Sequence, residues 1–294
     1  MGTQSRLIGI WLALAALLAA AGAAAADPAA WRIAGRNGGE ITLLGSMHVL
    51  RSADYPLPAA IDALFARADT LVMELDLDEL DPTAMQATLL RVATLPQGTV
   101  LRDVVPPDLY RLTEQRAGEV GMDLRLLEHF KPSLVSVMLL EQSLRRLGFE
   151  GERGLEQYLL RKSRAEAKPI IGLETLDMQL GIFADLPATS QQAMLEQTLR
   201  DMSEGDTVIG KLADAWRDGK LETLSKELLA SLDDIPGLDA ALVRNRNTEW
   251  VKTLERFLGD GRRYLVVVGA FHLVGHDNVI EMLDAHGQKA VRVH

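Results

Sequence analysis

The sequence contains no cysteine. Without cysteine the chain forms no disulfide bond, carries no thiolate nucleophile and offers no cysteine ligand to zinc. Its stability must therefore come from packing alone. With 294 residues, 48% of them hydrophobic, the chain is long enough to bury a sizeable core.

Positive charge is scarce, because 31 Lys and Arg residues face 41 Asp and Glu residues and the net charge at pH 7 is −10. A nucleic-acid binder needs a cationic face, so this composition argues against a nucleic-acid partner. The sequence also lacks internal repeats, low-complexity segments after residue 26 and linkers. These absences favour one domain, or one domain with a large insertion.

The first 26 residues have the order of a secretory signal peptide. Arg6 precedes an apolar run over residues 7–18, and an alanine-rich segment ends at Ala26, which suits a cleavage site before Asp27. We expect export with removal of residues 1–26, which leaves no stable membrane span in the mature chain. The alternative is an uncleaved membrane anchor, because the run approaches the length that spans a bilayer.

The remaining chain is strand-rich at both ends. Asn37-Gly38-Gly39 lies between β-prone runs and predicts a hairpin turn, since Asn and Gly tolerate positive φ. A helix to about Ala68 and an apolar strand from Thr70 to Leu75 follow, which together have the form of a parallel crossover unit. The C-terminal end predicts a strand (263–268), a helix (278–285) and a final strand (289–293).

The middle of the chain, from about residue 81 to 258, has mainly helical patterns, with helix starts at Pro106-Pro107 and Lys131-Pro132. A short apolar strand near 169–173 interrupts it, which argues against an independent helical domain. We therefore predict the α/β class, with a single domain over residues 27–294. Its central mixed sheet is built from the N- and C-terminal parts, and the helical segment is a large insertion.

Two copies of a strand-Gly-x-x-His motif are the strongest functional signal. Apolar, β-prone runs end in Gly45-Ser-Met-His48 and, near the C-terminus, in Gly269-Ala-Phe-His272. The glycines allow a sharp turn after the strand and a close approach of the backbone to a site. One copy alone is typical of a turn with a hydrogen-bonded histidine, but its duplication predicts that both histidines reach one site.

Two glutamates occupy similar positions at other strand ends. Glu74 lies at the end of the strand that begins at Thr70, and Glu174 follows the strand near 169–173. The carboxyl ends of parallel strands form the ligand crevice of an open sheet, so two imidazoles and two carboxylates are expected to converge. Such a set suits a divalent metal ion with bound water, whose proton is then lost more easily. The second carboxylate would serve as general base or further ligand.

Arg246 and Asn247 lie on a predicted helix before the last strands and add hydrogen-bond donors. Arg246 would hold a substrate oxygen, or neutralise Glu74 or Glu174. Each residue also has a structural alternative: an acidic surface turn for Glu74, a helix N-terminus for Glu174, and a solvated helix face for Arg246.

With these residues the sequence resembles the TraB/PrgY/GumN family, to which the Tiki Wnt-inactivating proteases belong. The resemblance covers nearly the whole chain after the leader and rests on Leu44-Gly45-Ser-Met-His48, Val72-Met-Glu74-Leu-Asp76, Pro169-Ile-Ile-Gly-Leu-Glu174-Thr175, Arg246-Asn247 and Val268-Gly269-Ala-Phe-His272-Leu-Val-Gly275. Together with the leader, this order is similar to the bacterial GumN-like, periplasmic branch. One departure is Gly154-Leu155-Glu156, where such proteins commonly carry Gly-x-Asp, and we assign no ligand role to Glu156.

The resemblance implies an α/β core like that of the erythromycin-esterase and ChaN-like proteins. It also implies a metal-dependent hydrolase, in the Tiki case a peptidase assisted by manganese or cobalt, with zinc as a further candidate ion. We accordingly expect a periplasmic or secreted protein that acts on a peptide or protein substrate. If the leader stays in place, the protein is membrane-anchored.

In this interpretation His48, Glu74 and His272 hold the metal ion, and Glu174 is a base or an additional ligand. Arg246 and Asn247 orient the substrate or the metal ligands. Two alternatives stay open: a periplasmic peptide-binding or regulatory protein without catalysis, and a metal-free, esterase-like hydrolase that uses a histidine base. The sequence specifies neither the substrate nor the oligomeric state.

Overall fold

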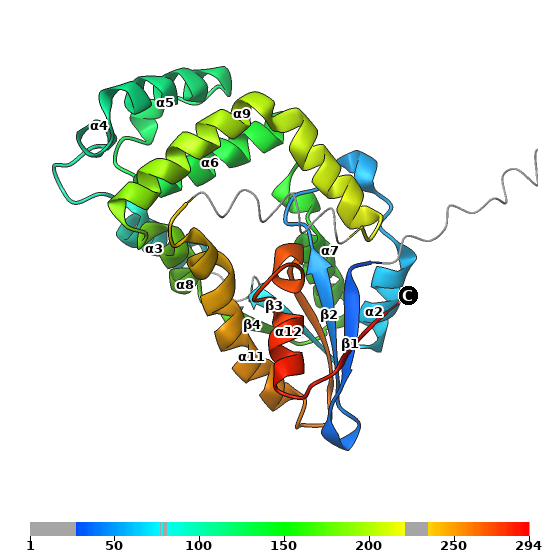
Figure 1. Ribbon diagram of the computed structural model, residues 1–294. Helices are drawn as coiled ribbons and strands as arrows, with labels where there is room; N and C mark the ends of the chain where they lie inside the picture. Colours follow the sequence, from blue (N-terminus) through cyan, green and yellow to red (C-terminus); the bar gives the residue numbers. More distant parts are fainter. Residues whose placement is uncertain (1–27, 77, 79–80, 221–234, 294) are drawn as a thin grey trace, which may run out of the picture.

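The computed structural model describes residues 28–76, 78, 81–220 and 235–293, so the expected signal peptide lies outside the described residues. A six-stranded sheet with the strand order β4-β3-β5-β2-β1-β6 forms its centre (Figure 1). The strands are β1 (Ala30–Ala34), β2 (Glu40–Ser46), β3 (Thr70–Leu75), β4 (Ile170–Glu174), β5 (Arg263–Gly269) and β6 (Ala290–Arg292). Strands β2, β5, β3 and β4 run parallel, whereas β1 is antiparallel to β2 and β6. The predicted α/β class with a mixed sheet is therefore confirmed.

The predicted hairpin opens the sheet. Asn37 and Gly38 take positive φ values of 54° and 79°, and the chain returns so that β1 and β2 pair. Strand β2 then runs beside β5 in a register that places Ser46 opposite Gly269. This register brings the two Gly-x-x-His segments to the same edge of the sheet.

Helices cover both faces of the sheet, which explains why its strands are continuous apolar runs. On one face, α2 (Ala59–Arg67), α7 (Leu155–Glu166) and the end of α9 (Ala188–Arg217) contribute side chains to a core that includes Leu265 and Val267 of β5. On the other face, α11 (Asn245–Phe257) and α12 (Val279–Ala285) share a core with Val266 and Val268. Alternate side chains of a strand point to opposite faces, so β5 contributes to both cores.

The helical insertion lies between β3 and β5 and is interrupted by β4, as expected. Besides α7, α9 and α11 it contains α3 (Pro82–Ala93), α4 (Leu101–Val104), α5 (Pro107–Glu119), α6 (Pro132–Arg146) and α8 (Leu176–Ala184). Figure 1 shows α5, α6 and part of α9 grouped above the sheet, where they share an apolar core of their own. Both α5 and α6 begin with proline, whose fixed φ suits the first helical turn. Within the described part of the chain, no helix is both long enough and apolar enough to cross a bilayer.

Candidate active site

The polar residues singled out in the sequence lie at the carboxyl ends of the four parallel strands. Glu74 and Glu174 belong to β3 and β4, whose last residues pair as Leu75 with Glu174. His48 follows β2 by two residues, and His272 lies in a 3-10 turn directly after β5. The structure thus gathers all four at one edge of the sheet, although they do not meet around a single point.

Arg246 of α11 joins three of these four side chains. Its Nε donates to Glu174 Oε1 at 2.8 Å, and its Nη2 donates to Glu174 Oε2 at 3.0 Å and to Glu74 Oε2 at 2.5 Å. Its Nη1 lies 3.0 Å from His272 Nε2. The guanidinium also lies over the ring of Trp250, which donates to Glu174 Oε1 at 2.9 Å. Arg246 is therefore a buried cation shared by two carboxylates, not part of a solvated helix face.

His272 is fully buried, and burial lowers its pKa to about 3, so the ring is neutral. Its tautomer follows from its neighbours. Asn247 Nδ2 donates to the carbonyl of Asp277 at 2.7 Å, which leaves Asn247 Oδ1 to accept from His272 Nδ1 at 2.6 Å. The lone pair on His272 Nε2 consequently faces Arg246, which donates to it.

His48 has the opposite environment. Its side chain is 54% exposed, and Nδ1 lies 2.8 Å from Glu156 Oε1. The negative charge of Glu156 raises the pKa of His48 to about 9. The other ring nitrogen, Nε2, points to Glu74 Oε1 at 4.0 Å, so His48 presents one free nitrogen beside a carboxylate.

Glu74 is held in one orientation from three sides. The backbone amide of Gly269 donates to Oε1 at 2.8 Å, while Gln179 of α8 and Arg246 both donate to Oε2, Gln179 at 3.1 Å. Burial by itself would raise the pKa of Glu74, but the charges of His48 and Arg246 and the Gly269 amide lower it below its ordinary value. The carboxylate is therefore ionised, and Oε1 is the oxygen turned toward His48.

Glu156 is a site residue that the sequence interpretation passed over. It lies in the first turn of α7, where Ser46 Oγ and His48 Nδ1 both bond to its Oε1. Gly154 makes this approach possible, because a Cβ at that position would collide with the carbonyl of His48. The signal for this residue is Gly154-Leu155-Glu156, in which the acid is one methylene longer than the Asp that such proteins commonly carry. Gln179 and Trp250 carry no comparable signal in the sequence.

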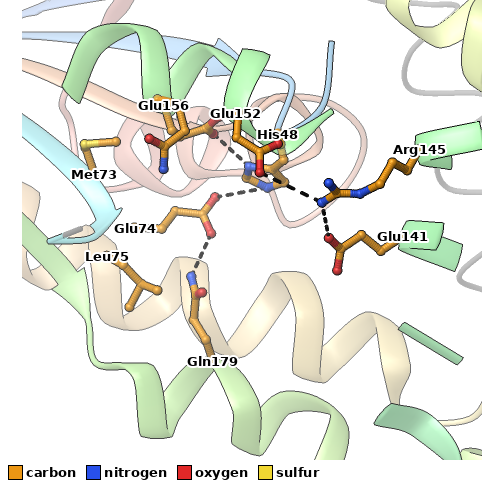
Figure 2. Close-up of a pocket in the computed structure, with 11 residues that line it drawn as sticks. His48, Met73, Glu74, Leu75, Glu141, Arg145, Glu152, Glu156 and Gln179 are labelled. Carbon is orange, nitrogen blue, oxygen red and sulfur yellow. Dashed lines mark hydrogen bonds and ion pairs between the residues drawn. The ribbon is translucent and has the colours of Figure 1, made fainter. Parts of the chain in front are cut away.

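A cavity of about 500 Å³ opens beside His48 and Glu74. Figure 2 shows His48, Glu74, Glu156 and Gln179 around it, with Arg145 of α6 across the open space. The site therefore has two layers. His48, Glu74 and Glu156 line the cavity, whereas Arg246, Glu174, His272 and Asn247 form a buried layer behind Glu74.

Two features of the cavity layer bear on whether it could hold a divalent metal ion. A Cβ on Gly269 would lie 3.1 Å from the Phe271 ring, 3.3 Å from His48 Nε2 and 3.4 Å from Glu74 Oε1, so the glycine leaves these two donor atoms uncovered. Glu156 Oε2 is buried and has no hydrogen-bond partner. Imidazole nitrogen and carboxylate oxygen are donors that Mn²⁺, Co²⁺ and Zn²⁺ accept.

His272 does not face this space, because its Nε2 accepts from Arg246. Among the described residues, three ligand atoms within 4.8 Å of one another occur only at Asp239, His276 and Asp277. That surface group lies outside the cavity, and Arg244 already pairs with both aspartates. Of the three expected metal ligands, only His48 and Glu74 thus present donor atoms to this space, His48 Nε2 and Glu74 Oε1, 4.0 Å apart.

Comparison with known proteins finds relatives of similar length. No solved structure matches significantly. The chain is 26% identical over 245 residues to the uncharacterized protein YbaP of Escherichia coli and, at the same identity, to that of Shigella flexneri. These alignments cover 82% of this chain and 86% of each relative. The TraB/PrgY/gumN family model matches residues 29–292. The resemblance found in the motifs is thereby confirmed, and the chain belongs to the TraB/PrgY/gumN family.

Proposed function

We propose that this protein is an exported, metal-dependent hydrolase that cleaves peptide bonds at the cavity beside His48 and Glu74. The observation that carries the proposal is the pair of inward-facing donor atoms, His48 Nε2 and Glu74 Oε1, which lie 4.0 Å apart at the cavity wall. A divalent ion bound there, manganese, cobalt or zinc, would lower the pKa of a bound water molecule and supply a nucleophile near neutral pH.

The charge balance of the site supports a bound cation. Glu74, Glu156 and Glu174 lie close together, and Arg246 is the permanent cation that bonds to two of them. The three carboxylates outnumber this one cation. The pKa of His48 is raised for the same reason, and a proton on its ring offsets part of the negative charge. Metal binding to an imidazole displaces such a proton, so an ion would take over this role.

The surrounding residues have separate tasks in this proposal. Glu156 holds Nδ1 of His48 and thereby turns Nε2 toward Glu74, as carboxylates commonly do behind a ligating histidine. Arg246 and Gln179 fix Glu74 from the other side. Glu174 has both oxygens engaged by Arg246 and does not line the cavity, so we assign it to positioning Arg246 and not to proton transfer.

Metal titration of the purified protein tests the proposal. We expect Mn²⁺ binding by the wild type and at least a tenfold loss of affinity in His48→Ala, because one of two facing donors is removed. His286→Ala is the matched control, since His286 is 53% exposed and its Nδ1 lies 2.9 Å from Glu255, much as in the His48–Glu156 pair. Absence of binding, or equal loss in both variants, would contradict the metal site.

Digestion of a peptide library with added Mn²⁺ tests the activity itself. We expect cleavage by the wild type and none by His48→Ala. Binding of many peptides without cleavage would instead support a peptide-sequestering protein, which is the non-catalytic alternative.

A metal-free hydrolase is the second candidate, and the buried layer gives it specific support. Arg246 already neutralises Glu74, and the Glu156–His48 pair has the arrangement of a carboxylate that orients a catalytic base. In that case activity survives exhaustive chelation. It also rises as the pH approaches 9, because His48 must lose its proton before it can act as a base.

A further inference from the structure

The cavity extends outward from the proposed reaction centre to a wall that the proposed chemistry does not use. Glu141 and Arg145 of α6 and Glu152 of the turn before α7 form this wall (Figure 2). Their side chains are 62%, 48% and 70% exposed, so they are accessible to a ligand. The cavity volume of about 500 Å³ lies within the range of ordinary ligand pockets, roughly 300–1,000 Å³.

Carboxylates outnumber cations on this wall. Arg145 Nη2 lies 3.1 Å from Glu141 Oε1 and 3.9 Å from Glu152 Oε1, so one guanidinium is shared by two acids. Glu141 lies one helical turn before Arg145 and is bonded to it, whereas Glu152 is held only loosely and faces solvent.

The inner part of the cavity adds to this imbalance. Three carboxylates, those of Glu74, Glu156 and Glu174, share two cationic groups, Arg246 and the His48 ring, and Glu156 keeps one buried oxygen without a partner. A cavity lined by an excess of one charge focuses the electrostatic potential and concentrates ligands of the opposite charge.

We propose that this outer wall binds a positively charged group of the substrate, an ammonium or a guanidinium, next to the bond that is cleaved. The inference rests on the proposed function and names the substrate class of the same cavity. A peptide offers such a group in two ways, through a Lys or Arg side chain or through its free amino terminus. The carboxylates of Glu141 and Glu152 attract the positive group of the peptide, and the positive charge of Arg145 weakens this attraction.

Binding measured without catalysis tests this inference. Purified protein is immobilised in EDTA at 4 °C and incubated with a library of N-acetylated, C-amidated heptapeptides, and the bound peptides are quantified by mass spectrometry. A parallel library has free amino termini. We expect wild-type protein to enrich Lys- and Arg-containing peptides over Asp- and Glu-containing ones, and Glu141→Gln/Glu152→Gln to reduce this enrichment about three- to tenfold. Arg145→Gln should increase it.

A control variant must distinguish the effect of these wall residues on peptide binding from the effect of the protein's overall negative charge. Glu196→Gln/Glu249→Gln removes the same number of charges from exposed ion pairs with Arg200 and Lys252 on other helices, and should leave the enrichment unchanged. Stronger binding of the free-amino library than of the acetylated library, without a preference for Lys or Arg, identifies the amino terminus as the bound group. The inference fails if wild-type protein prefers basic groups in neither library, or if the control variant loses as much as the wall variant. Peptides that bind but stay uncut after Mn²⁺ is added count against the proposed hydrolase and leave the cation-binding wall supported.

Discussion

The two histidines of the Gly-x-x-His motifs have opposite proton affinities because of their different surroundings. Burial lowers the pKa of His272 to about 3, whereas the charge of Glu156 raises that of half-exposed His48 to about 9. The same motif therefore produces a ring that is neutral at neutral pH in the buried layer and a protonated ring at the cavity. Under the proposed function, only the second kind of ring would exchange a proton for a metal ion near neutral pH.

NMR titration of the histidine rings in metal-free protein checks this difference. We expect His48 to titrate near pH 9 and Glu156→Gln to bring its pKa back toward 6.5, because the neighbouring charge is removed. An unchanged His48 pKa in Glu156→Gln would show that Glu156 is not its partner.

The two shifts also have opposite consequences for stability. Because its folded-state pKa is raised, His48 contributes stability below pH 6.5 that is lost as the pH rises through about 9. The folded-state pKa of His272 is lowered, so this residue destabilises the fold as the pH falls below 6.5. In that range its ring binds a proton in the unfolded chain but not in the folded chain.

Two elements carry most of the site, and each does so through its helical geometry. On α11, Arg246 and Trp250 are one turn apart and both reach Glu174, while the adjacent Asn247 turns to His272. A π-helical segment, Ala240–Arg244, leads directly into this helix, and such segments are frequent at functional sites. On α7 the first turn brings Glu156 to His48, and this requires a glycine at position 154.

Gly154→Ala tests the role of α7. A Cβ at this position meets the His48 carbonyl, so the helix start must move and take Glu156 with it. We expect a loss of about 1–3 kcal/mol in the free energy of unfolding and a 10- to 100-fold weaker metal affinity, roughly the effect of removing a residue that orients a ligand. Gly151→Ala is the control, because no atom lies within 4 Å of its added Cβ. Equal metal affinity in the two variants would contradict the positioning role.

The sequence predicted those parts of the site that depend on local patterns. Strand ends are marked by apolar runs and glycines, and parallel strands place their ends together, so the gathering of His48, Glu74 and His272 at one edge could be anticipated. Which nitrogen faces the cavity depends on contacts between distant segments. The partners of His48 and His272 come from α7 and α11, and no periodicity in the sequence specifies those pairings.

At the scale of the whole molecule, the helical insertion is tied to the sheet beneath the site. The end of α9 places Trp216 in the sheet core, where it is 3% exposed and its Nε1 donates to the carbonyl of Gly45 at 2.8 Å. The beginning of the same helix places Leu199 in the separate core that α9 shares with α5 and α6. One helix therefore connects both apolar cores with the first Gly-x-x-His motif.

This connection predicts that the sheet and the insertion unfold together. Trp216→Ala should lower the free energy of unfolding by about 3–5 kcal/mol and Leu199→Ala by about 2–5 kcal/mol, because each leaves a cavity in a buried core. If the cores are coupled through α9, both substitutions shift the same single denaturation curve, and tryptophan fluorescence and far-UV circular dichroism give coincident transitions. Two separate transitions, with Leu199→Ala moving only one of them, would mean that the insertion folds as an independent unit. The site would then depend on the sheet-covering helices alone, and Leu199→Ala should leave metal affinity intact.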